Sequence, residues 1–392
     1  MSSSKVLVVS PVSTHPPHRG NRQRILQIAR LFRENGFDVE LAIGRNRKLT
    51  DEAKAFWPVI HRLKRSPRWR PTSKNVPLDA WYTPGLGEEV AEIVDRQKID
   101  VVLLNYIFHS KLLDYLPQDV VKIIDTHDVF TNRRELYVGY RYTGGFFSCT
   151  SEDEAAYLSR ADVALSISPG DTKKFSELLP QLPIIDLPFI AQNGKPASQA
   201  GVTSKPSVNK TVGIVLSAND LNVASLHSFI AAVDDQYGRT SPFRVVVAGD
   251  ISSKSIRILP HRIPIFSRPW IRYVGQVPDI HAFYETVDVI AVPVIAGSGM
   301  AIKFSEAILA EAPVISTAHG SRGHKVTHPL HRLENNWEVA KQLGSIHQAS
   351  MNELRKAEQD YQASAETAVQ QGWASLNGTI SNRTAPASAP SD

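Results

Sequence analysis

The sequence has a single cysteine and no long apolar run, and both absences exclude classes of protein. Cys149 alone cannot form an internal disulfide or a cysteine-based zinc site, and its neighbours include no histidine or lysine that would activate the thiol. No window approaches the roughly 18 apolar residues of a membrane-spanning helix. The N-terminal Met-Ser-Ser-Ser-Lys is followed by a short β-rich run instead of the apolar core of a secretion signal. We therefore expect a cytoplasmic protein.

Two frequent nucleotide-binding motifs are also missing. The sequence contains no GxxxxGK[ST], which excludes a P-loop. The loop from Ser10 to Asn21 has one glycine, Gly20, where a dinucleotide-binding loop has GxGxxG. Gly85 and Gly87 precede two glutamates, and this pattern indicates the start of a helix rather than a phosphate-binding loop.

The chain does contain two successive series of alternating β-rich and helical segments. With 392 residues it exceeds what one hydrophobic core usually supports. We predict an α/β protein of two doubly wound Rossmann-like domains that face a central cleft. The first domain is expected over residues 1–190 and the second over 211–376, with a crossing of the last helices back to the first domain as an open alternative. Residues 191–210 are predicted to be a linker and residues 377–392 a disordered tail.

One strand-to-helix junction in the second series has the composition of an anion site. A buried strand ends at Val294, the loop Gly297-Ser298-Gly299 follows, and the next helix carries Lys303 and Glu306 in its first turns. Free N–H groups at a helix start attract anions, and glycines allow close approach to the main chain. Lys303 and Glu306 lie three residues apart, on one helix face, and are suited to hold a diphosphate and a ribose diol. A glycine turn before a helix with a surface ion pair is the open alternative.

This junction carries a resemblance to a known family. The run Gly-Ser-Gly-x-x-x-Lys-x-x-Glu-Ala, continued by residues 312–317, resembles the donor-binding segment of family 4 glycosyltransferases of the GT-B fold. It corresponds to a Gly-Ser-Gly/Lys variant of the two-glutamate (E-x7-E) motif of that family. Further family landmarks occur in the same order along most of the chain. They lie at Pro16-Pro17 with Gly20 and Arg24, and at residues 35–39, 125–128, 161–163, 247–249, 273–277 and 287–293.

The resemblance implies an enzyme that moves a sugar from a nucleotide-sugar donor, UDP- or GDP-linked, to an acceptor with retention of configuration. It implies no metal and no other cofactor, a donor held mainly by the second domain and an acceptor held mainly by the first. Glu306 would bind the ribose hydroxyls, Lys303 would neutralise the leaving diphosphate, and Gly20 would face the phosphates. The remaining implied donor contacts are Asn222, Gly275, Gly297, Ser298, Gly299, Met300, Ala301 and Ile302.

The chain departs from this family at two places. Ser298 stands where the motif has its first glutamate, and residues 217–222 contain none of the Arg and Lys often found there. We interpret these differences as a variant active site. Ser298 also favours an alternative of another class, a non-catalytic GT-B protein that binds a nucleotide sugar or glycan and supports a partner enzyme.

His127 and Asp128 are the candidates for contact with the sugar or the acceptor. They follow Asp125 and Thr126 at the end of a predicted strand, and a carboxylate neighbour can orient an imidazole and raise its pKa. A hydrogen-bonded loop histidine is the open alternative. In retaining transfer the leaving phosphate can accept the proton of the acceptor, so no protein base is strictly required.

Four histidines gather near the C-terminal end of the second series. They are His319, His324, His328 and His331, with no cysteine and with Glu334 as the one nearby carboxylate. We expect no metal site there, because no cysteine and only one carboxylate accompany these histidines.

The formal charge of +5 is concentrated in one segment. Residues 45–74 contain ten Lys and Arg against two acidic residues. Trp57 and Trp69 lie among cations that include Arg62, Lys64 and Arg65, a composition typical of contact with an anionic membrane surface. A solvated basic face is the alternative, and we expect no nucleic-acid partner because no binding motif accompanies the charge.

The expected location follows from this segment together with the resemblance. We expect a protein peripheral at the inner face of the plasma membrane. Its acceptor would be a glycan or a lipid-linked glycan in the synthesis of cell-surface polysaccharide, lipopolysaccharide or exopolysaccharide.

Overall fold

A computed structural model describes residues 3–17, 19–65, 74–138, 147–191, 210–251, 266–297, 299–310 and 312–384. The chain divides into two compact units, each built on its own sheet. The first unit takes described residues 3–134, 147–190 and 367–384, and the second is formed mainly by residues 210–366.

The first unit contains a seven-stranded parallel sheet in the order β3-β2-β1-β4-β5-β6-β7. Its strands are β1 (Lys5–Ser10), β2 (Asp38–Gly44), β3 (Ile60–Leu63), β4 (Val101–Asn105), β5 (Val121–Asp125), β6 (Val163–Ser166) and β7 (Ile184–Asp186). The helical elements of this part of the chain are α1 (Gly20–Glu34), α2 (Asp51–Phe56), α3 (Leu86–Gln97), η1 (Ile107–Tyr115), α4 (Arg133–Val138), α5 (Ser151–Leu158) and α6 (Pro169–Leu178).

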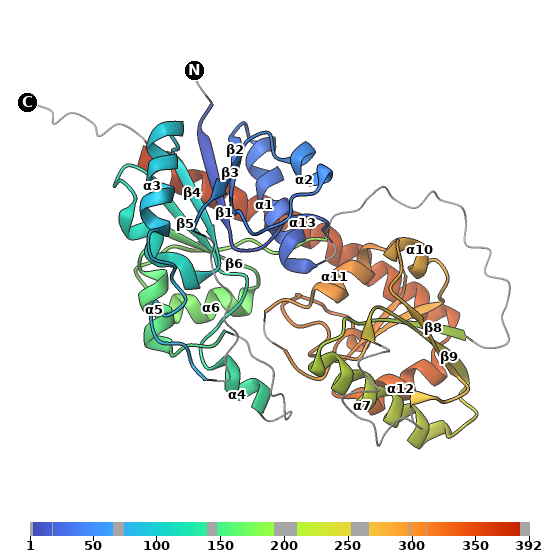
Figure 1. The fold of residues 1–392 in the computed structure, drawn as a ribbon. Coiled ribbons are helices and arrows are strands. Elements are labelled where there is room, and N and C mark those ends of the chain that lie inside the picture. Colours follow the sequence, from blue (N-terminus) through green and yellow to red (C-terminus); the bar gives the residue numbers. More distant parts are fainter. Residues whose placement is uncertain are drawn as a thin grey trace, which may run out of the picture. The chain divides into compact units, whose positions relative to one another are not determined.

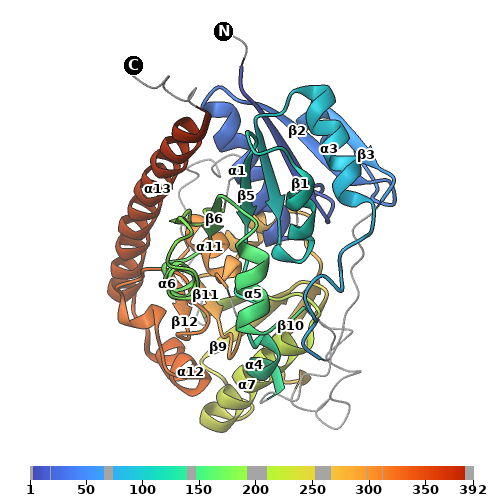
Figure 2. The same ribbon diagram turned by 90° about the vertical axis from the view of Figure 1, so that its left-hand side faces the viewer.

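Both faces of the first sheet are apolar because successive side chains of a strand point to opposite sides. Val6 and Val8 belong to one buried cluster, and Leu7 and Val9 belong to another. α1 and the C-terminal part of α13 (Gln348–Thr384) cover the first of these faces, whereas α3, η1, α5 and α6 cover the second (Figure 1). Figure 2 shows α13 and α3 on opposite sides of this sheet.

The second unit repeats this architecture with a five-stranded parallel sheet in the order β10-β9-β8-β11-β12. Its strands are β8 (Lys210–Val215), β9 (Phe243–Ala248), β10 (Ile271–Gly275), β11 (Val289–Val292) and β12 (Val314–Ser316). The helices are α7 (Asp220–Tyr237), α10 (Ile280–Tyr284), α11 (Ile302–Leu309), η3 (Pro329–His331) and α12 (Asn336–Ser345). α7, α12 and the start of α13 pack on one face of the sheet, and α10 and α11 pack on the other.

The strand order of both sheets defines where a ligand would bind. In the first sheet β1 lies between β2 and β4, and in the second β8 lies between β9 and β11. The connections that leave these central strands turn to opposite sides, and ligands of doubly wound sheets bind at the carboxyl ends of the strands where this reversal occurs. The two expected sites are therefore the ends of β1 and β4 and the ends of β8 and β11.

The end of the chain differs from the sequence-based expectation. Residues 377–384 were predicted as part of a disordered tail, but they belong to α13 and to the first unit. Residues 367–376 also belong to the first unit, which agrees with the predicted alternative that the last helices cross back to the first domain. The reason is a buried apolar stripe at helical spacing, which packs into the first core. It consists of Val369, Trp373, Leu376 and Ile380.

Most predicted strands and helices are present, with boundaries shifted by a few residues. Gly85 has a left-handed backbone with φ of 81° immediately before α3, which confirms the predicted helix start. Two short strands, β3 and β7, were not predicted. The predicted linker, residues 191–210, lies outside the described residues except for its two ends.

Replacing Trp373 by alanine tests the docking of α13 on the first unit. The Trp373 ring packs edge-on against Phe32 and Phe37, with ring centroids 5.1 Å and 6.1 Å apart. We expect Trp373→Ala to lower the free energy of unfolding by about 3–5 kcal/mol, measured by urea denaturation followed by circular dichroism. Trp337→Ala is the matched control, because 43% of Trp337 is exposed, and its expected loss is below about 1 kcal/mol. Equal losses for the two variants would contradict this packing.

Candidate functional site

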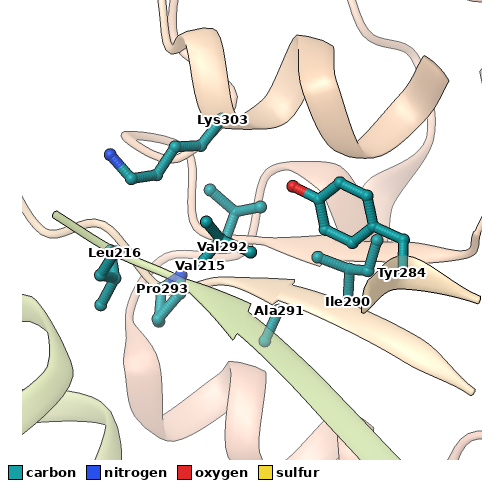
Figure 3. A pocket seen from close by; sticks show the side chains of 8 residues that line it. All are labelled: Val215, Leu216, Tyr284, Ile290, Ala291, Val292, Pro293 and Lys303. Atoms are coloured by element: carbon teal, nitrogen blue, oxygen red, sulfur yellow. The ribbon is translucent and has the colours of Figure 1, made fainter. Parts of the chain in front are cut away.

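A small pocket lies in the second unit where β8 and β11 end. It is lined by Val215, Leu216, Tyr284, Ile290, Ala291, Val292, Pro293 and Lys303. Figure 3 shows the Lys303 side chain reaching out from a helix above the strands, with the Tyr284 ring beside them. The pocket therefore occupies the reversal point of the second sheet and combines apolar walls with one cation.

Lys303 lies among charged groups of both signs. Its pKa is lowered because burial disfavours the ammonium form, and the nearby positive charge of Arg322 lowers it further. The carboxylates of Glu306 and Asp250 favour the charged ammonium and raise the pKa of Lys303. Glu306 also adds to the raised pKa of Tyr284, which places this carboxylate near both pocket residues. Lys303 and Glu306 thus share the region that their spacing predicted.

The backbone between β11 and α11 has the conformations that its glycines allow. Gly297 and Gly299 have φ values of 153° and 62°, a region that other residues seldom adopt. Ala301 precedes α11, and no side chain caps this start of the helix. Met300 and Ala301 are buried, and Ile302 is the first residue of α11. Uncapped N–H groups beside a flexible backbone suit an anion that approaches the main chain.

Two other predicted donor contacts make hydrogen bonds within the second unit, and a third lies outside the described residues. Gly275 ends β10 with a φ of 72°, and its carbonyl accepts a hydrogen bond from the Gly249 amide at 2.7 Å. Asn222 is buried, and its side-chain amide donates to the carbonyl and the hydroxyl of Ser217. These two hydrogen bonds of the Asn222 side chain therefore hold the loop between β8 and α7. Ser298 lies outside the described residues.

A polar cluster occupies the corresponding place in the first unit, at the ends of β4 and β5. Its centre is the buried ion pair between Arg24 of α1 and Asp125, with an N–O distance of 3.1 Å and no exposed side-chain surface. Arg24 also donates to the carbonyl of Leu187 after β7. The pair links α1 to two strands, and the two charges neutralise each other inside the core.

His127 is fixed against this ion pair. Its Nε2 lies 2.9 Å from Asn105 Oδ1 and 3.2 Å from Asp125 Oδ2. The side-chain nitrogen of Asn105 donates to the Val9 carbonyl, so its oxygen faces the imidazole and Nε2 must carry the hydrogen. The His127 ring stacks on Tyr106, with centroids 4.0 Å apart. In the neutral ring Nδ1 is consequently the acceptor nitrogen.

One expectation about His127 is wrong. Asp125 does orient the ring, but the pKa of His127 lies below its ordinary value because burial outweighs the carboxylates of Asp125 and Asp128. Arg24 lowers the pKa further. His127 is therefore neutral near pH 7.

Gly20 and Asp128 flank the same region. Gly20 is the first residue of α1, and the next residue, Asn21, donates to the Tyr106 hydroxyl at 2.8 Å. Asp128 accepts from the Val129 amide and lies 3.0 Å from the Arg133 guanidinium. The carboxylate of Asp128 is thus held by a neighbouring cation.

The proposed membrane patch is only partly at the surface. Trp57 is 1% exposed and its indole donates to Thr14, so its assignment to a surface patch is wrong. The sequence pattern does not distinguish a surface ring from a buried ring that lies beneath cations of a neighbouring helix. Trp57 is the second case, because the Arg33 guanidinium of α1 lies over its ring. Arg62 donates to the carbonyls of residues 45 and 47, whereas Lys64 and Arg65 are exposed. Trp69 lies outside the described residues.

The predicted absence of a histidine metal site remains a prediction. His324 interacts with the Tyr361 hydroxyl and the Ala301 carbonyl, and His331 lies 3.3 Å from Glu358. The described parts of the chain contain no group of three potential metal ligands and no helix that is long and apolar enough to span a membrane.

Several contributors to these sites were not predicted. Tyr106, Asn105 and Arg322 carry no motif, and the partners Arg24 and Asp125 are separated by 101 residues. Arg24 and Asp125 lie within landmarks of the family resemblance, but nothing in the sequence indicated that the two side chains pair with each other.

Comparison with known proteins agrees with this architecture. Residues 209–347 match the sequence model of the family described as glycosyl transferases group 1, a stretch that includes every residue lining the pocket. A search of curated proteins finds no match.

Several solved structures resemble the whole chain at low sequence identity. Sucrose-phosphate synthase from Thermosynechococcus elongatus has a TM-score of 0.70 and 15% identity, with coverage of 97% of this chain and 98% of the other. A glycosyltransferase from Rickettsia africae has a TM-score of 0.65 and 13% identity, with coverage of 99% and 100%. HepE from Anabaena, solved with UDP and glucose, has a TM-score of 0.60 and 15% identity, with coverage of 97% and 100%. The predicted GT-B fold of two Rossmann-like domains is confirmed.

Neutralising Asp125 tests the buried ion pair. Asp125→Asn leaves the Arg24 guanidinium in the core without a counter-charge, and we expect it to lower the free energy of unfolding by about 3–5 kcal/mol in urea denaturation. Asp95→Asn is the control, because Asp95 pairs with Lys98 on the surface and both side chains are 81% exposed. The control should change stability by less than about 0.5 kcal/mol. A loss for Asp125→Asn as small as that of the control would show that the pair contributes little.

Proposed function

We propose that this protein is a glycosyltransferase that transfers a sugar from a nucleotide-sugar donor to a glycan or lipid-linked acceptor. The observation that carries the proposal is the position of Lys303 over the pocket at the ends of β8 and β11, beside the glycine-containing start of α11. The family match over residues 209–347 supports it, because this match covers the same pocket. HepE, which shares the fold, has been solved with UDP-glucose.

The donor would lie with its diphosphate at the start of α11. The bond between the anomeric carbon and the diphosphate breaks, and both electrons go to the leaving phosphate oxygen. Lys303 stabilises the negative charge that develops on this oxygen. The backbone N–H groups around Gly297, Gly299 and Ile302 add to this stabilisation. Glu306 would accept hydrogen bonds from the ribose hydroxyls. UDP or GDP is the proposed leaving nucleotide.

The acceptor would bind to the first unit near the ends of β4 and β5. Its hydroxyl oxygen bonds to the anomeric carbon, and its proton passes to the departing phosphate, so that transfer proceeds with retention and without a metal or other cofactor. The Nδ1 atom of His127 is an acceptor for a sugar or acceptor hydroxyl, because Nε2 already donates to the protein. Asp128, held by Arg133, is the second candidate for contact with the sugar or the acceptor, and Gly20 at the start of α1 would face the donor phosphates.

The biological setting is proposed from the charge distribution. Lys64 and Arg65 are exposed cations of the basic segment and are suited to contact an anionic membrane surface. We propose a peripheral location at the inner face of the plasma membrane and a role in the synthesis of cell-surface polysaccharide.

Calorimetric titration with UDP, GDP, ADP and their sugars tests the donor site. We expect one nucleotide to bind, and we expect Lys303→Gln and Glu306→Ala each to weaken this binding about 10- to 100-fold, because each removes a charged hydrogen-bonding group. Lys341→Gln is the matched control, since Lys341 is an exposed lysine of α12 in the same unit. Its affinity should equal that of the wild type.

Two results would contradict the proposal. If none of these nucleotides binds, or if Glu306→Ala and Lys303→Gln bind as the wild type does, the donor-site assignment is wrong. Tight binding without sugar transfer to any membrane extract would favour the non-catalytic alternative.

A further inference from the structure

A short segment after β12 packs against the start of α11 in the second unit. It consists of Arg322, Gly323 and His324. The Arg322 carbonyl accepts a hydrogen bond from the Ala301 amide at 3.0 Å, and Nε2 of His324 lies 3.0 Å from the Ala301 carbonyl. Both backbone groups of Ala301 are thus held by this segment, which fixes the residue immediately before α11.

The close approach depends on Gly323. Its φ is 82°, and a Cβ atom at this position would lie 2.9 Å from the Cα of Met300. A side chain would therefore force the segment away from the glycine loop. The backbone around residue 323 is shaped to lie directly on the junction between β11 and α11.

Arg322 places its guanidinium at the same junction. A Cβ atom added to Gly297 would lie 2.6 Å from the guanidinium carbon of Arg322, so the side chain lies against the backbone of Gly297. Nη1 donates to the His319 carbonyl at 2.9 Å, which orients the guanidinium. Arg322 is also near enough to Lys303 to lower its pKa. The guanidinium of Arg322 therefore lies beside a backbone that a phosphate can approach, and its positive charge acts on Lys303.

The loop that follows β8 supplies no positive charge. The loop between β8 and α7, residues 217–222, contains neither lysine nor arginine. The side-chain amide of Asn222 is used to hold that loop. Within the described part of the chain, a diphosphate bound at the ends of β8 and β11 would thus find its cationic partners on α11 and the segment after β12 rather than in this loop.

We propose that Arg322 is a second diphosphate-binding residue of the donor site and acts together with Lys303. This assignment rests on the proposed function and deepens it. The planar guanidinium can donate two parallel hydrogen bonds to phosphate oxygens, whereas Lys303 acts as a compact charge. Together they stabilise the negative charge of the departing nucleoside diphosphate when its bond to the sugar breaks.

The test compares a nucleoside diphosphate with the matching nucleoside by calorimetry on the full-length protein. The probe is whichever of UDP, GDP and ADP the wild type binds best, with uridine, guanosine or adenosine as its partner. We expect Arg322→Gln to weaken diphosphate binding about 10- to 100-fold and to leave nucleoside binding unchanged. Arg322→Lys, which keeps the charge but not the planar fork, should lose less.

Lys325→Gln is the matched control, because it removes the same charge from an exposed position three residues along the same segment. It should bind both probes as the wild type does. Circular dichroism and thermal melting establish whether each variant is folded. If Arg322→Gln does not fold, the comparison of diphosphate and nucleoside binding is made with Arg322→Lys.

Three results would overturn the inference. If Arg322→Gln binds the diphosphate normally while Lys303→Gln does not, the donor site stands and Arg322 has no part in it. If Arg322→Gln weakens nucleoside and diphosphate equally, Arg322 only maintains the structure of the site. If the wild type binds no nucleotide, the proposed function itself fails, and this assignment fails with it.

Discussion

Parallel strands that lie side by side end at the same edge of their sheet, and this constraint decides where polar groups can gather in the protein. The central strands are buried on both faces, so most of their side chains are apolar and cannot carry chemistry. Polar residues collect at the carboxyl ends instead. Because β1 neighbours β4 and β8 neighbours β11, the loops diverge at one point in each sheet. The pocket of the second unit is found at this point, and the polar cluster of the first unit lies next to it, at the ends of β4 and β5.

The two clusters differ in how their charges are compensated. In the first unit Arg24 and Asp125 neutralise each other in the core, and His127 is neutral and held by hydrogen bonds. In the second unit Lys303 and Arg322 bring two cations to a junction with an uncapped helix start. A neutral sugar hydroxyl suits the first environment, and a diphosphate suits the second. The difference in charge therefore supports the division into an acceptor side and a donor side.

The sequence was sufficient for what depends on short-range pattern. Alternating β-rich and helical segments predicted the sheets, and glycines followed by Lys303 and Glu306 identified the junction at which the pocket lies. Pattern failed where tertiary packing decides the outcome. Trp57 lies among cations in the sequence but is buried, and residues 377–384 have a polar composition but continue α13 because Leu376 and Ile380 fill the first core.

The remaining differences between the sequence-based predictions and the structure also arise from tertiary packing. Asp128 and Asp125 flank His127 in the sequence and suggested a raised pKa, but burial, which composition does not reveal, lowers it. Arg322 is 19 residues beyond Lys303 and belongs to no motif, and it joins the site only because Gly323 allows its segment to lie on Met300. Contacts between segments that are distant in sequence need the three-dimensional structure.

A crystal structure of the protein with the nucleotide it binds would test the central claim most directly. We expect the diphosphate at the carboxyl ends of β8 and β11, with phosphate oxygens within hydrogen-bond distance, about 3 Å, of Lys303 Nζ. Nucleotide bound at the ends of β1 and β4, with no phosphate near Lys303, would contradict the assignment of the donor site to the second unit.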